Sequence, residues 1–164
     1  MMQTARALLA IDAATRGAFA WQEAGTVHSE AFHVPAGEHP GARYYAMYAQ
    51  VLARLYGLRP DAVVYEQSFL RGGASVRVLV GLQTAIQMAC AYAQVPVLAV
   101  NPSEWRTLIP AEWRPGRVIS GDWKALAERL AREQFGAPAD LTQDEYDARC
   151  MLAWACRYAT WRTP

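Results

Sequence analysis

The sequence predicts an α/β fold: a five-stranded mixed sheet, with three antiparallel strands followed by two parallel ones, flanked by helices. Two patterns indicate this. Three β-prone runs separated by turn residues occupy the first 34 positions, which is typical of an antiparallel meander. Farther along, a helical segment separates two apolar runs, as in a right-handed parallel crossover. The 164 residues, 53% of them hydrophobic, suffice to bury a core, so we expect a single domain over 1–164.

Hydrophobic periodicity together with turn and capping residues indicates where each element begins and ends. The first long helix follows a Pro- and Gly-rich loop at 35–41 and is expected to end at Gly57. Asp122 and Thr142 are the expected N-caps of the last two helices, and Gly136 ends the first of these. In order, the expected elements are strands over 7–12, 18–21 and 26–34, a helix over 42–57, a strand over 62–66, a helix over 75–93, a strand over 97–100, a short helix over 102–109, and helices over 122–135 and 143–160.

Two of the expected strands end in an acid. The run Ala62–Tyr65 is apolar and β-prone enough to be buried on both faces, and Glu66 follows it directly. Asp12 ends the first strand in the same way. A buried carboxylate is costly without a partner, and α/β proteins place their chemistry at the carboxyl ends of strands. The two acids therefore mark the expected site.

A second pair of acids opens the last helix. Asp144 and Asp147 are three residues apart, which places both on one helix face. The helix then becomes apolar over 151–155, so the pair lies where a mostly buried helix enters the protein. Acids in a first helical turn also interact favourably with the helix dipole, and for Asp144 and Glu145 taken alone this structural explanation is the better one.

If Asp12, Glu66, Asp144 and Asp147 converge, their mutual repulsion requires a cation. Carboxylate oxygens suit Mg²⁺ or Mn²⁺, and two such ions about 4 Å apart can activate a water and stabilise the leaving oxygen in phosphodiester cleavage. With four acids bound to metal, eleven acids would face sixteen basic residues, an excess of +5 that suits a phosphate backbone. Fifteen of these basic residues are arginine, which fits either phosphate binding or a GC-rich coding sequence.

Cysteine usage and hydropathy bear on location. Three cysteines without a CxxC pattern support neither a disulfide framework nor a zinc site, and they predict a reducing compartment. The N-terminus lacks the form of a signal peptide, so we expect a cytoplasmic location. The uncharged stretch 78–103 is long enough to span a bilayer. Its glutamines and the break at Val95–Val97 favour a buried helix and a strand instead, so no membrane is expected as a partner.

Over nearly its whole length the chain resembles the RuvC-type Holliday-junction resolvases of the ribonuclease H-like nuclease superfamily. Ile11-Asp12 followed by Gly17 is similar to that family's first strand, and Glu66-Gln67-Ser68-Phe69 to its second acid and the loop after it. Asp144-Glu145-Tyr146-Asp147-Ala148 is similar to its closing D-x-x-D-A pattern. The resemblance implies a ribonuclease H-like fold, usually a homodimer, that nicks four-way DNA junctions using divalent metal. This chain would be a divergent or phage-type member, located in a bacterial or phage-infected host cytoplasm.

The resemblance also implies roles for individual residues. The four acids would hold two Mg²⁺ or Mn²⁺ ions. Lys124, the only lysine, falls where the family has a catalytic lysine, although it also fits an ordinary exposed lysine. Arg106 lies near a second basic position, and either cation could stabilise charge developing on the phosphate. Phe69 stands where a family aromatic engages junction bases, and it fits equally well as a core residue that closes the strand.

Further arginines are candidates for contacts with branched double-stranded DNA. Arg71 and Arg77 flank the glycines after Glu66, and Arg114 and Arg117 lie in a Pro- and Gly-containing loop over 110–121. The apolar helix at 75–93 fits either a helix sandwiched inside the monomer or part of a dimer contact.

Two departures from the family pattern keep other functions open. The turn Ala13–Gly17 is shorter than the usual one and altered, and the chain is less basic than expected of a cellular resolvase. The alternatives are a catalytically silent DNA-binding module on the same fold and a nuclease for other branched DNA or RNA–DNA hybrids. An actin-like ATPase half is disfavoured because the chain is short and has no Gly-rich phosphate loop.

Overall fold

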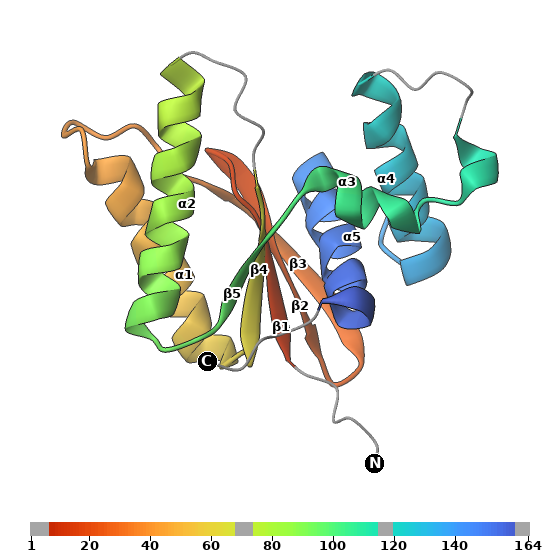
Figure 1. Ribbon diagram of the computed structural model, residues 1–164, viewed down its shortest axis with the longest axis horizontal. Helices are drawn as coiled ribbons and strands as arrows, with labels where there is room; N and C mark the ends of the chain where they lie inside the picture. Colours follow the sequence, from red (N-terminus) through yellow and green to blue (C-terminus); the bar gives the residue numbers. More distant parts are fainter. Residues whose placement is uncertain (1–6, 68–73, 115–119, 160–164) are drawn as a thin grey trace.

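The computed structural model describes residues 7–67, 74–114 and 120–159. Its five strands form one sheet in the order β3-β2-β1-β4-β5 (Figure 1). β1 pairs antiparallel with β2 and parallel with β4; β2–β3 is antiparallel and β4–β5 parallel. This is the predicted mixed sheet. Its strands are β1 (Leu8–Asp12), β2 (Arg16–Glu23), β3 (Thr26–His33), β4 (Ala62–Glu66) and β5 (Val97–Val100), and the helices are α1 (Ala42–Leu58), α2 (Ala74–Tyr92), α3 (Pro102–Trp105), α4 (Ser120–Phe135) and α5 (Gln143–Tyr158).

Helices cover both faces of the sheet (Figure 1). Helices α1 and α2 lie on one face, and α3, α4 and α5 lie on the other. Side chains alternate between the two cores along each strand: Leu9 and Ile11 of β1 face α1 and α2, whereas Leu8 and Ala10 face α5. Asp12 and Glu66 continue the second series, so both acids leave their strands on the α5 side of the sheet.

The sheet face beneath α5 consists largely of small side chains. Ala10, Ala18, Ala20 and Ala62 are all fully buried there, and α5 packs across β1, β2, β3 and β4. Alanine side chains let a helix backbone approach a sheet closely. The first turns of α5 therefore lie close to the carboxyl ends of β1 and β4.

The helix termini confirm some predicted caps and correct others. Thr142 caps α5 as predicted, in a reciprocal capping box with Glu145. The prediction that Asp122 caps α4 is wrong, because the helix begins at Ser120 and Asp122 lies in its first turn, where an acid suits the helix dipole. Helix α1 also continues past Gly57 to Leu58, and Arg59 ends it in the left-handed conformation (φ 49°).

The uncharged stretch at 78–103 divides into most of α2, a turn and strand β5, as predicted. Gln94 adopts a positive φ of 56° in that turn, which lets the chain reverse toward β5. None of the helices within the described ranges combines the length and apolar character that crossing a bilayer requires.

Gly17 determines how closely β2 passes the end of β1. A Cβ atom at this position would overlap the carbonyl oxygen of Asp12 and lie 2.8 Å from the Phe32 ring. Because the backbone of β1 cannot move aside as a flexible side chain can, glycine is required here. The pattern of Asp12 followed by Gly17 thus has a packing cause next to the candidate site.

We expect Gly17→Ala to lower the free energy of unfolding by about 2 kcal/mol or more, because the added methyl forces β1 and β2 apart. Gly57→Ala is the matched control: it has open space within 4 Å and lies in a helix, so alanine should stabilise by up to about 1 kcal/mol. Urea unfolding of both variants measures the difference. A Gly17→Ala protein as stable as wild type would contradict the packing argument.

Candidate active site

The carboxyl ends of β1 and β4 place Asp12 and Glu66 next to each other. The two strands pair in parallel with Ile11 opposite Tyr65, so the following residue on each strand is an acid. Both acids are partly buried. The charge of Glu66 helps to raise the pKa of Asp12, which means that the two carboxylates are close enough to repel each other.

Helix α5 brings Asp144 and Asp147 to the same place. Their charges also raise the pKa of Asp12, and the charges of Glu66 and Asp144 raise that of Asp147. The four acids singled out in the sequence therefore lie together, contributed by β1, β4 and the first turns of α5.

A buried polar network that the sequence analysis missed fixes the start of α5 to β3. Glu145 is only 8% exposed; its Oε1 accepts from the Ser29 hydroxyl (3.0 Å), and its Oε2 accepts from the Thr142 N–H (3.0 Å) and hydroxyl (2.9 Å). Arg149, one turn farther along and also buried, donates from Nε to the same Ser29 hydroxyl (2.8 Å). The available signal was the T-x-x-E capping pattern, which sets Glu145 apart from its two acidic neighbours.

Burial is the largest cause of the raised pKa values in the cluster. It raises the pKa of Asp147 from an ordinary 3.8 to about 7, and it raises those of Asp12 and Glu66 as well. Asp12 and Asp144 share a side-chain hydrogen bond that raises the pKa of Asp12 and lowers that of Asp144. Burial thus favours the protonated form of these acids, and a bound cation would favour the ionised form.

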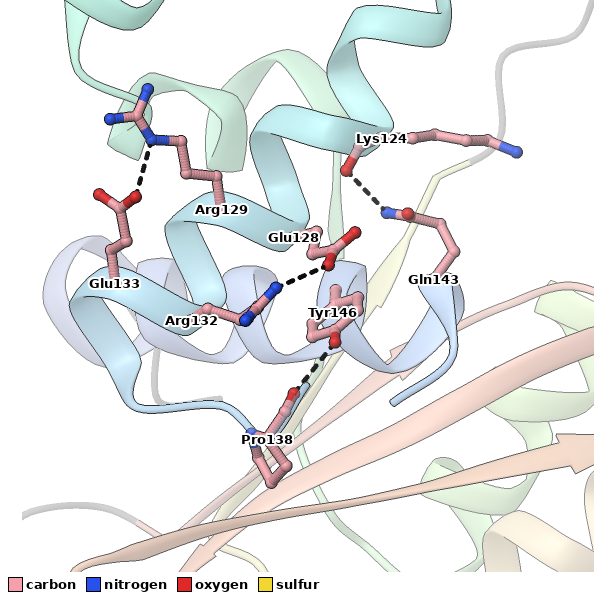
Figure 2. A network of polar contacts seen from close by, with 8 residues as sticks. All are labelled: Lys124, Glu128, Arg129, Arg132, Glu133, Pro138, Gln143 and Tyr146. Atoms are coloured by element: carbon pink, nitrogen blue, oxygen red, sulfur yellow. Dashed lines mark hydrogen bonds and ion pairs between the residues drawn. The ribbon is translucent and has the colours of Figure 1, made fainter. Parts of the chain in front are cut away.

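Gln143 connects Asp147 with helix α4. Its Nε2 donates to Asp147 Oδ1 (2.9 Å) and to the backbone carbonyl of Lys124 (3.3 Å). Figure 2 shows this contact between the start of α5 and α4, with the Lys124 side chain extending away from it. The Tyr146 hydroxyl also donates to the Pro138 carbonyl (3.0 Å), which fixes the connection between the two helices (Figure 2).

Two of the predicted cations lie beside the acids. The charge of Lys124 lowers the pKa of Asp144, and the charge of Arg106 lowers those of Glu66 and Asp147. Lys124 is exposed and Arg106 is half-buried. The structure therefore places a cation near each of three acids, and the catalytic roles of Lys124 and Arg106 stay predictions.

The other residues predicted to contact DNA differ in their surroundings. Arg77 is exposed on α2. Arg114 instead donates from Nη2 to the backbone carbonyls of Ile109 (2.7 Å) and Arg106 (3.2 Å), so it holds the segment after α3 together. Phe69, Arg71 and Arg117 lie outside the described residues.

The donor chemistry of the four acids suits a hard divalent cation, since all of them offer carboxylate oxygens. Within residues 7–67, 74–114 and 120–159, however, no group of three or more His, Cys, Asp or Glu side chains is arranged to hold a metal ion as it stands. The Asp12 and Asp144 side chains are hydrogen-bonded to each other. A cation held by both carboxylates would take the place of this hydrogen bond.

Comparison with solved structures finds this fold in RuvC from Thermus thermophilus, with a TM-score of 0.64 at 20% identity over 92% of this chain and 95% of that one. A structure of T. thermophilus RuvC in complex with Holliday junction substrate gives 0.69 at 21% identity with the same coverage. The yeast mitochondrial Holliday junction resolvase Ydc2 gives 0.59 at 11% identity over 93% of this chain and 78% of that one. No protein-family model and no curated protein sequence matches the chain.

These likenesses establish the fold. The chain has a ribonuclease H-like fold with the mixed five-stranded sheet and flanking helices that the sequence predicted. In particular it has the fold of RuvC, which confirms the resemblance seen in the sequence at the level of architecture.

We expect the acid cluster to destabilise the metal-free protein as the pH rises. The folded-state pKa of Asp147 lies above its unfolded value, so the contribution of this group to stability is greatest below about pH 4 and is lost as the pH rises toward 7. Asp147→Asn removes this charge while its amide oxygen can still accept from Gln143. In EDTA at pH 8 it should raise the free energy of unfolding by on the order of 2 kcal/mol, measured by urea unfolding.

Asp140→Asn, which removes an exposed acid outside the cluster, serves as the control and should change stability little at any pH. At pH 4 the advantage of Asp147→Asn should disappear. If Asp147→Asn is no more stable than wild type at pH 8, the four carboxylates do not repel one another as described.

Proposed function

We propose that this protein is a metal-dependent, structure-selective DNA endonuclease that resolves four-way junctions. The observation that carries the proposal is the convergence of Asp12, Glu66, Asp144 and Asp147 at the carboxyl ends of β1 and β4 in a RuvC-like fold. One RuvC structure and the Ydc2 structure are named for Holliday junctions, which supports the choice of substrate.

The four acids would hold two Mg²⁺ or Mn²⁺ ions. Such ions, when bound, supply a water activated at neutral pH and positive charge at the leaving oxygen. Lys124 is exposed beside Asp144, so it can stabilise negative charge that develops on the phosphate. Arg106, next to Glu66 and Asp147, can do the same from the other side of the acids.

A catalytically silent DNA-binding module is the main alternative. Against it stands the cost of the site: a module that only bound phosphate would gain nothing from four half-buried carboxylates facing the DNA. A nuclease for other branched DNA or for RNA–DNA hybrids would use the same acids, and only the choice of substrate distinguishes it.

The decisive assay is nicking of a labelled immobile four-way junction beside matched linear duplex, with Mg²⁺, Mn²⁺ or EDTA. We expect paired symmetric nicks on the junction only, lost in EDTA. Asp12→Asn and Glu66→Gln should each reduce cleavage roughly 100-fold or more, because each removes a carboxylate from the reacting site. Junction binding should remain within a few-fold of wild type.

Asp140→Asn again serves as the control, with unchanged cleavage expected. Metal-dependent cutting of flaps or hybrids in place of junctions would mean that the acid site is catalytic but that its substrate is not a four-way junction. Junction binding without cleavage in either metal would support the silent module and overturn the nuclease.

We also propose that the protein acts as a homodimer through α1 and α2. Two symmetric nicks need two active sites, and one chain supplies one. The outer faces of these helices carry exposed apolar side chains, with Tyr45 72%, Tyr92 67% and Met88 59% exposed. A groove between the helices is lined by Tyr44, Tyr45, Tyr48, Gly81, Thr84, Ala85 and Met88.

Met88→Glu should convert a dimer into a monomer, because it places a charge in this apolar groove. Gln134→Glu adds the same charge on exposed α4, across the sheet, and should leave the dimer intact. Sedimentation equilibrium measures both. Wild-type protein that is monomeric at micromolar concentration, or a dimer that survives Met88→Glu, would rule out this interface.

A further inference from the structure

Trp105 lies at the end of α3, where the chain passes from β5 to the face that carries α5. An Asn101–Glu104 capping box fixes the short helix directly after β5. The Trp105 side chain is 1% exposed and is part of the core beneath α4 and α5. Its polar atom nevertheless points at the acid cluster: the indole Nε1–H donates to Glu66 Oε2 at 2.9 Å.

This hydrogen bond gives the Glu66 carboxylate a fixed partner. An indole N–H only donates, so it favours the ionised form of the acid that accepts from it. Burial raises the pKa of Glu66, and the Trp105 hydrogen bond and the charge of Arg106 oppose that rise. With Oε2 engaged, the plane of the carboxylate cannot rotate freely.

The same indole ring also supports Arg106. The guanidinium lies 5.4 Å from the Trp105 ring centroid and 5.0 Å from that of Trp123. The Arg106 Nε is buried and has no hydrogen-bond partner among the described residues. The two aromatic rings therefore hold this cation beside Glu66 and Asp147.

We propose that Trp105 is a positioning residue for the acid site: its N–H orients the Glu66 carboxylate for a divalent cation, and its ring holds Arg106 beside that carboxylate. This inference rests on the proposed function in taking Glu66 as a metal ligand. It goes beyond it by giving a core tryptophan two separable tasks, one for the N–H group and one for the ring. A residue that only filled the core would have neither.

Trp105→Phe separates the two tasks, because it keeps a ring beneath Arg106 and removes the donor to Glu66. We expect the Mg²⁺ concentration for half-maximal junction cleavage to rise about 10- to 100-fold, as when an outer partner of a metal ligand is lost. The KM for the junction should change less than about twofold, since Arg106 keeps its ring contact. Trp113→Phe, whose ring packs on Arg129 away from the acids, should leave both values unchanged.

A Trp105→Phe protein that has a lower melting temperature but the wild-type Mg²⁺ dependence would overturn the proposal and leave Trp105 a core residue. Because Phe is smaller than Trp, Trp105→Phe also loses packing in the core. A second measurement therefore uses protein in which Trp105 is intact. The indole N–H proton resonance of Trp105 in metal-free protein should lie downfield and should move upfield in Glu66→Ala, while the other indole signals stay in place.

The two measurements also separate this inference from the proposed function. If wild-type protein binds Mg²⁺ but cuts no junction, the nuclease fails, and the indole signal still tests the hydrogen bond: it should shift on addition of Mg²⁺. An indole resonance unaffected by both Glu66→Ala and Mg²⁺ overturns the role of Trp105, whatever the protein cleaves.

Discussion

Four carboxylates gathered in a poorly solvated place repel one another, and the rest of the structure has to keep them there. The small side chains of the sheet make this possible. Ala10, Ala18 and Ala20 let α5 lie close to the sheet, so acids from a helix and from two strands meet. The Ser29 hydroxyl, held between Glu145 and Arg149, then fixes the helix in position at its acidic end. Packing energy from an apolar helix thus opposes local electrostatic strain.

The groups around the acids divide into those that supply charge and those that supply orientation. Lys124 and Arg106 supply positive charge next to different acids. Gln143 and Trp105 are neutral donors, to Asp147 and Glu66 respectively, and they orient a carboxylate without cancelling its charge. A site that must accept a divalent cation benefits from this division, because neutral donors leave its negative charge in place.

The fold and the place of the four acids could be predicted from the sequence because both follow from short-range patterns. Buried runs ending in Asp12 and Glu66, and the spacing of Asp144 and Asp147, are visible in the chain itself. The roles of Ser29 and Trp105, and the contact that joins Glu145 to β3, were not, since these depend on contacts across 39 to 120 positions. The prediction that Asp122 is an N-cap was wrong because an acid suits an N-cap and a first helical turn equally well.

The alternation of side chains along β1 also limits how this sequence can change length. Asp12 shares its side of the sheet with Leu8 and Ala10. Inserting or deleting one residue within β1 would turn the acid toward α1 and α2, into a core of large apolar side chains. A change of two residues would keep the acid on the α5 side but move it about 7 Å along the strand. Length variation should therefore accumulate in the turn after Asp12 and spare the strand before it.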